Sequence, residues 1–332
     1  MTSIGIIANP VSGKDIRRLV SHATVIDNGE KINIIERIVL GAQSLGVDTV
    51  YMMNDSHKMG MKVRDRLKSS NELKCEINLT DTITFNSIKD TVNAAEFMEK
   101  NNAGCLIVLG GDGTCRAVAK AVEQTPVIAI STGTNNVYPE MLEGTVAGMA
   151  AAAVASGLLD RQSYSERDKR IEIYSVSKLL DIALVDAVIS NNAFVGSRAI
   201  WDMDEIEKIF VTRSHPASIG FSSIVGCSKV VLPEDDFGAW VNLDNDTDTI
   251  LAPVAAGMLE PVKSGEPMEL KLEQEYEYTA DDSGTIALDG EREIEFVKGQ
   301  RFTFKISRKG PYRVNVVKAL EAAGRNGFFK LT

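Results

Sequence analysis

The stretch that decides the fold of this chain is CLIVLGGDGTCRAVAK, residues 105–120. It begins with an apolar run, 105–109, which predicts a buried strand that stops at two glycines. Apolar residues then recur at helical spacing over 114–124. Glycines let the backbone approach a ligand closely, and the first N–H groups of a helix are available to anions. The stretch therefore predicts a strand, a phosphate-binding turn and a helix, in that order.

The flanking sequence repeats this alternation of apolar runs and helical periodicity. We expect strands over 4–8, 47–53 and 127–130, and helices over 31–45 and, behind Ser87, over 88–98. Strands that alternate with helices favour a parallel sheet covered by helices on both faces. We therefore expect residues 1–145 to form an α/β domain.

The pattern changes after Asp160, where polar and apolar residues alternate, for example over 170–176, 269–273 and 301–306. Such alternation is typical of antiparallel strands with one wet face. Residues 146–311 should therefore form a β-rich domain or a β-sandwich. Helical spacing returns over 316–323, and we expect a C-terminal helix, 312–332, to pack back on the first domain.

The composition is that of an ordinary globular protein and excludes collagen-like and disordered chains. The 332 residues, 44% hydrophobic and 25% charged, suggest about two domains. A net charge of −10 argues against nucleic acid as a partner. The longest uncharged stretch, 144–159, is rich in Ala and Gly and too short to span a bilayer of about 30 Å, so we expect a tightly packed helix and no membrane segment. Four scattered cysteines and three histidines make a zinc or disulfide framework improbable, which favours a cytoplasmic location.

Three polar loops follow strands of the first domain, at 9–14, 110–114 and 131–136. Loops at the carboxyl ends of parallel strands line one crevice, where ligands bind. Neither familiar nucleotide motif fits these loops: residues 8–15 lack the first glycine and the final Ser or Thr of a P-loop, and 111–116 lack the third glycine of a dinucleotide fingerprint. A dehydrogenase is therefore not expected.

The motifs GGDGT, TGTNN and LDGE occur in this order, within IGIIANPVSGKDIRRLV, VLGGDGTCRAVAK, ISTGTNNVYPEMLEGT, DIALVDA, ASIGFSSIVG and IALDGERE. With them the chain resembles the ATP-NAD kinase/AcoX-like family, within the NAD kinase and diacylglycerol kinase superfamily. The resemblance implies a Rossmann-like N-terminal domain, a β-sandwich C-terminal domain, ATP bound between them and magnesium-assisted phosphoryl transfer to a small-molecule substrate.

The resemblance also assigns roles to individual residues. Asp112 would organise Mg²⁺ or accept the proton of the attacking hydroxyl, and Asp289 and Glu291 of the DGE motif would supply catalytic carboxylates. Asn136 and Asp186 would contact the acceptor. The nucleotide would be bound by Asn9, Ser12, Lys14, Gly110, Gly111, Gly113, Thr114, Thr132, Gly133, Thr134 and Asn135.

One departure from the family bears on the acceptor. NAD kinases carry an ALNE-like or ALND-like stretch whose Asn contacts the dinucleotide, whereas this chain has Val185 in ALVD, residues 183–186. NAD is the first acceptor to consider. The alternatives are a lipid or sphingoid-type kinase and a non-catalytic nucleotide-binding accessory protein. We also expect a homo-oligomer, a dimer or a tetramer.

Four residues keep a second interpretation. Asp112 is a good helix cap, Asp289-Gly290 is a good hairpin turn, and Lys14 could be a solvated loop residue. Cys115 lies near a predicted helix N-terminus, which would lower its pKa, or else it is a small, half-buried residue.

Overall fold

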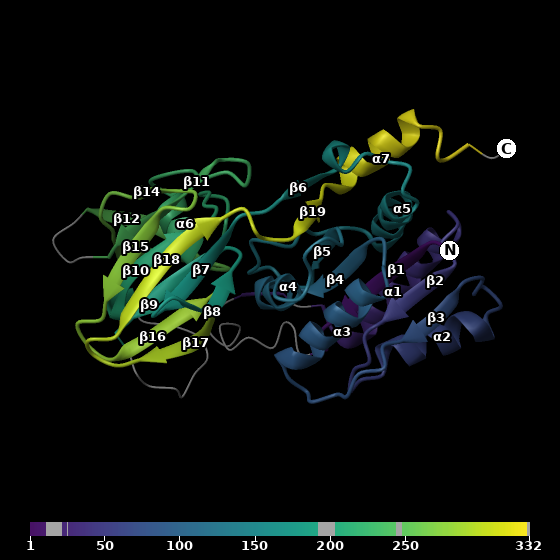
Figure 1. The fold of residues 1–332 in the computed structure, drawn as a ribbon, viewed down its shortest axis with the longest axis horizontal. Helices are drawn as coiled ribbons and strands as arrows, with labels where there is room; N and C mark the ends of the chain where they lie inside the picture. The colour runs from purple at the N-terminus through teal and green to yellow at the C-terminus, as the bar shows by residue number, and fades with distance from the viewer. Residues whose placement is uncertain (11–21, 25, 192–202, 244–247, 331–332) are drawn as a thin grey trace.

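A computed structural model describes residues 1–10, 22–24, 26–191, 203–243 and 248–330 of the chain. Figure 1 shows two units: strands and helices alternate in one, and antiparallel strands make up most of the other. The predicted fold class, a parallel α/β sheet followed by antiparallel β-structure, is confirmed.

The first unit is built on a seven-stranded sheet of order β3-β2-β1-β4-β5-β19-β6. Its first five strands in chain order are parallel. They are β1 (Ser3–Ala8), β2 (Thr49–Met52), β3 (Glu76–Leu79), β4 (Leu106–Gly110) and β5 (Val127–Ser131). The short strands β6 (Ser165–Arg167) and β19 (Tyr312–Val314) extend the sheet beyond β5.

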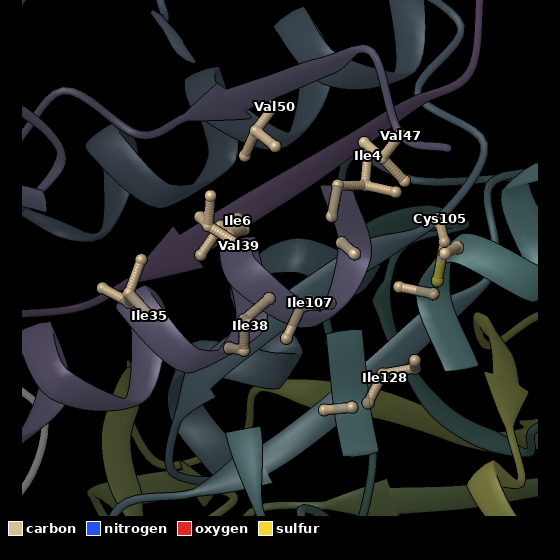
Figure 2. Close-up of a cluster of buried hydrophobic side chains, with 14 of the residues drawn as sticks. Ile4, Ile6, Ile35, Ile38, Val39, Val47, Val50, Cys105, Ile107 and Ile128 are labelled. Carbon is tan, nitrogen blue, oxygen red and sulfur yellow. The ribbon is translucent and has the colours of Figure 1, made fainter. Parts of the chain in front are cut away.

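Helices cover both faces of this sheet, as the alternating pattern predicts. One face packs against α1 (Asn28–Gln43), α2 (Met59–Ser69), α5 (Gly144–Ala155) and α7 (Val316–Arg325). The other packs against α3 (Ile88–Lys100) and α4 (Asp112–Ala119). Figure 2 shows the centre of the first layer, where Ile35, Ile38 and Val39 of α1 lie over the sheet.

The Ala- and Gly-rich stretch forms the buried helix α5, as predicted. A Cβ on Gly148 would lie 2.2 Å from the carbonyl oxygen of Ile38, so the backbones of α5 and α1 are in direct contact. Only small residues allow two helices to approach this closely. None of the helices in the described residues has the length and apolarity needed to cross a bilayer.

The second unit consists mainly of two antiparallel sheets that pack face to face. The larger has the order β14 (Met268–Lys271), β11 (Phe237–Asn242), β10 (Ile206–Val211), β9 (Asp186–Ser190), β16 (Gly284–Leu288) and β17 (Glu291–Phe296). The smaller has the order β15 (Glu275–Thr279), β18 (Arg301–Ser307), β7 (Arg170–Ser175) and β8 (Lys178–Ala183). Phe210 of one sheet stacks on Phe304 of the other, with ring centroids 4.3 Å apart. We call this unit the sandwich.

The outer face of the larger sheet packs against α6 (Phe221–Gly226) and the hairpin of β12 (Thr249–Ala255) and β13 (Met258–Lys263).

The end of the chain differs from the expectation in one respect. The expected helix over 312–332 is shorter, because residues 312–314 pair with β5 and β6 as strand β19, and α7 begins only at Val316. The helix does pack against α5 of the first unit.

The expected division after residue 145 falls inside α5. We propose to place it near Asp168, where the chain leaves β6 for β7.

Candidate functional site

The glycine-rich turn lies where β4 ends and α4 begins. Its glycines make room for side chains from distant segments. A Cβ on Gly111 would lie 2.6 Å from Oδ1 of Asn136, and one on Gly113 would lie 2.9 Å from Oε1 of Glu291. Glycine at these two positions leaves room for a neighbouring side chain that approaches the backbone closely. The turn therefore brings together residues predicted separately from the GGDGT, TGTNN and LDGE motifs.

Behind the turn, a buried lysine begins a chain of hydrogen bonds. Nζ of Lys31 donates to the carbonyl oxygen of Asn9 at 2.9 Å, and Nδ2 of Asn9 donates to Oγ1 of Thr114 at 3.2 Å. Lys31 is only 1% exposed. The sequence did hold a signal for it, because position 31 falls on the apolar stripe of the predicted helix, with Ile35 and Ile38 at helical spacing.

The carboxylate of Asp112 ties the loop after β5 to the turn. It accepts hydrogen bonds from the backbone N–H groups of Val137, at 3.1 Å, and Tyr138, at 2.8 Å. Gly111 is the N-cap residue of α4, and Asp112 is the first helical residue. Asp112 therefore positions the 131–136 loop, whatever further role it has toward a ligand.

The 131–136 loop reaches the turn through Thr132, whose N–H donates to the carbonyl of Gly110 at 3.2 Å. Within the loop, Nδ2 of Asn136, a predicted acceptor residue, donates to the carbonyl of Gly133 at 3.2 Å. Thr134 instead exchanges hydrogen bonds with Thr24.

Two members of the predicted nucleotide-binding set need separate mention. The Oδ1 atom of Asn135 is buried and has no hydrogen-bond partner among the residues that the structure describes. Ser12 and Lys14, by contrast, lie outside the described residues.

Asp289 is a hairpin-turn residue, as its second interpretation predicts, and its carboxylate points inward. Asp289 and Gly290 have φ of 51° and 81° and connect β16 to β17. The carboxylate is fully buried and accepts hydrogen bonds from the backbone N–H groups of Leu184, Val185 and Asp186 at 2.8–3.2 Å. Burial raises the pKa of this carboxyl, against the opposing effects of the Arg116 guanidinium and the three amides. Asp289 therefore anchors the start of β9.

Arg116 of α4, which sequence reasoning missed, joins the two units. Its side chain is 0% exposed, and its guanidinium faces four carboxylates of the sandwich. The N···O distances are 2.6 Å to Glu293, 3.3 Å to Asp181, 3.6 Å to Glu291 and 3.8 Å to Asp289.

Burial alone would lower the pKa of Arg116, but the carboxylates of Asp289, Glu293 and Asp181 outweigh it and raise this pKa. An arginine within an amphipathic helix gave no sign of this role, because its partners lie far away in sequence.

Asp186, one of the two predicted acceptor residues, and its neighbour Val185 lie deeper than Glu291. Val185 is 1% exposed and belongs to the same buried apolar cluster as Cys115 and Val118 of α4. Asp186 is also buried, and its carbonyl oxygen accepts the N–H of Asp289. Glu291, with 45% of its side chain exposed, is therefore the most accessible of the carboxylates around Arg116.

Of the two interpretations of Cys115, the structure supports the small packing residue, because the side chain is buried and burial raises the pKa of its thiol well above the usual value. The nearby carboxylates of Asp112 and Asp289 act in the same direction. Cys115 is a packing residue of α4.

The turn suits an anion, and its surroundings suit a cation that accompanies one. The first N–H groups of α4 are the donors that phosphate oxygens prefer. In the described part of the chain, no group of three or more His, Cys, Asp or Glu side chains could hold a metal ion. Mg²⁺ is commonly held by one or two carboxylates together with substrate phosphates. Asp112 and Glu291 fit that arrangement.

Two protein families match successive parts of the chain. The ATP-NAD kinase N-terminal domain family matches residues 4–159, and the acetoin catabolism protein X C-terminal domain family matches residues 169–309. Acetoin catabolism protein X of Cupriavidus necator is 33% identical to this chain over 342 aligned positions, which cover 97% of this chain and 92% of the relative.

Solved structures resemble the fold at much lower sequence identity. Yeast NADH kinase complexed with NADH is 14% identical with a TM-score of 0.53, and the match covers 100% of this chain and 90% of that one. An NAD kinase from Archaeoglobus fulgidus in complex with ATP is 15% identical with a TM-score of 0.44, over 85% and 99% of the two chains. The first of these likenesses agrees with an NAD kinase-like fold.

Proposed function

This chain belongs to the acetoin catabolism protein X family, and we propose that it transfers the γ-phosphate of ATP to a hydroxyl group of a small acceptor. The observation that carries the proposal is the position of the Glu291 carboxylate beside Gly113, at the N-terminus of α4. Phosphoryl transfer needs mainly positioned phosphates, charge neutralisation and a group that orients the nucleophile. The turn and the carboxylates supply these requirements.

In this proposal the N–H groups of the turn bind the ATP phosphates, and Asn9 and Thr114 set the turn's shape. Mg²⁺ would be held by the nucleotide phosphates with Asp112 or Glu291, and it would neutralise phosphate charge. Glu291, as the accessible carboxylate, would accept the proton of the attacking hydroxyl.

NAD is the first acceptor to test, because the match over residues 4–159 is to an ATP-NAD kinase domain. The test incubates the full chain with ATP, Mg²⁺ and NAD and measures NADP. Activity should fall by about 100-fold in Glu291→Gln and in Asp112→Asn, because each loses a charge in the proposed site. Phosphoryl transfer from ATP to another acceptor, with no NADP formed, would refute NAD as the acceptor and would still support the kinase activity. A phosphorylated product in the organic phase with extracted lipids would identify a lipid kinase.

A second function, nucleotide binding without transfer, is favoured by a specific observation. Val185 is buried and stands at the position where NAD kinases have the Asn of their ALNE-like or ALND-like stretch. The carboxylates of Asp112 and Asp289 are engaged by backbone amides. Calorimetry with ATP would distinguish the two functions. Binding of ATP without transfer to any acceptor in the panel would favour the accessory role.

A further inference from the structure

The guanidinium of Arg116 lies next to Glu291, the carboxylate proposed to accept the proton. Arg116 follows Thr114 by two residues on α4, and its guanidinium lies 3.6 Å from Oε2 of Glu291. The other carboxylate oxygen of Glu291 lies beside Gly113, where a Cβ would be 2.9 Å away. Glu291 is thus located between the glycine turn and the buried cation.

The same guanidinium fixes the strand that carries Glu291. Nη2 meets Glu293 at 2.6 Å, and Nη1 meets Asp181 of β8 at 3.3 Å. Nε points toward Asp289 at 3.8 Å, the residue that starts the β16–β17 turn. Only the planar fork of arginine presents donors in these several directions at once, whereas a lysine offers a single point charge.

We propose that Arg116 is a positioning residue: it holds the Glu291 carboxylate beside the glycine turn and so couples the phosphate-binding unit to the sandwich. This inference rests on the proposed function. Because Arg116 is fully buried, it acts through Glu291 and does not contact the substrate. A displacement of about 1 Å in such a carboxylate is enough to cost up to 100-fold in rate.

The kinetic test is a double-mutant cycle between Arg116 and Glu291. Arg116→Lys keeps a positive charge but loses the fork, and should lower kcat by about 10- to 100-fold while the KM for ATP changes by less than about threefold. In a Glu291→Gln background the same substitution should cost less than about threefold further in kcat. Equal losses in both backgrounds would overturn the proposal, because Arg116 would then act independently of Glu291.

Lys120→Met is the matched control. Lys120 pairs with Asp181 at 2.7 Å, so its loss removes a cation from the same carboxylate cluster without touching the Arg116–Glu291 contact. Its kcat should stay within about twofold of wild type. If Arg116→Lys does not fold, Glu293→Gln is the alternative variant. It removes the charge of the carboxylate with the shortest N···O distance to Arg116, and it should lower kcat by about threefold. An unchanged kcat in Glu293→Gln would then count against the proposal.

Hydrogen–deuterium exchange tests the coupling without any activity. In Arg116→Lys, amides over 110–117 and over 286–294 should both exchange about tenfold faster, and in Lys120→Met neither should change. If Arg116→Lys left exchange in both segments unchanged, the positioning role would be wrong even in an active kinase. If exchange changed as expected while wild type transferred phosphate to no acceptor, the proposed function would fail and the coupling would stand.

Discussion

Two regions of this chain bury a cation near the junction of its two units, and they surround it differently. On α4, Arg116 lies among four carboxylates. Just before β7, Lys169 is also 0% exposed, but its Nζ donates to two carbonyl oxygens, those of Leu232 at 2.9 Å and Phe237 at 2.6 Å.

The two pKa values move in opposite directions. Burial lowers the pKa of Lys169 to about 8, and the charge of Arg308 acts in the same direction. The carboxylates around Arg116 raise its pKa despite burial. The comparison teaches that the charge of the partners, together with the depth of burial, sets the direction in which the pKa of a buried cation moves.

The largest effect should come from removing the carboxylate-bound cation. Arg116→Met should lower the free energy of unfolding by about 3–5 kcal/mol, because it leaves buried carboxylates without their counter-ion. Urea unfolding at pH 7 measures this loss. A loss below about 1 kcal/mol would mean that the four carboxylates do not depend on Arg116.

The pH dependence of Lys169 is the second test. Its unfolded-state pKa of 10.5 exceeds the folded value of about 8, so the unfolded chain binds more protons between these values. Its contribution to stability is complete above pH 10.5 and is lost as the pH falls through 8. The stability of wild type relative to Lys169→Met should therefore rise with pH between 8 and 10.5, by up to about 3 kcal/mol. A pH-independent difference would show that Lys169 does not titrate in this range.

A smaller effect should follow at Lys31, the buried lysine behind the glycine turn. Lys31→Met removes the donor to the Asn9 carbonyl, and should cost about 1–2 kcal/mol of stability. Because Asn9 in turn contacts Thr114, the affinity for ATP should fall while any remaining kcat is kept. Thermal unfolding with and without ATP measures both. Equal stabilisation of variant and wild type by ATP would show that Lys31 does not contribute to the affinity for ATP.

The smallest effect should be that of Lys120, the partly exposed neighbour of Arg116. Lys120→Met should cost less than about 1 kcal/mol in urea unfolding, since solvent screens an ion pair whose lysine is 28% exposed. A cost equal to that of Arg116→Met would show that the cluster needs cations in general, and not the buried arginine.

Much of the fold could be predicted because its signals are local. The strand over 105–109 appears as β4 (Leu106–Gly110), and the helix behind Ser87 appears as α3, capped by Ser87 and Asp90. Polar–apolar alternation over 301–306 appears as β18. The short strand β19 was missed, because three residues carry no usable period and become a strand only by pairing with β5 and β6.

The candidate site was predicted less evenly, for a related reason. The glycine turn, Asn9, Asn136 and Glu291 were all identified by motif and do lie together. Arg116 has no motif and was missed, because its partners come from β8 and from the β16–β17 hairpin.

The sequence by itself determined the alternation of strands and helices, the glycine turn and the change to β-structure, since periodicity and glycine placement act within a few residues. Only the tertiary structure decided which carboxylates accept hydrogen bonds from backbone amides and which one lies partly exposed beside the turn. Asp112, Asp289 and Glu291 are the same kind of group in sequence. Two of them are engaged by backbone amides of the 137–138 and 184–186 segments, whereas Glu291 faces Arg116 and lies partly exposed beside Gly113. That difference depends on contacts between residues more than 20 positions apart, which the fold alone brings together.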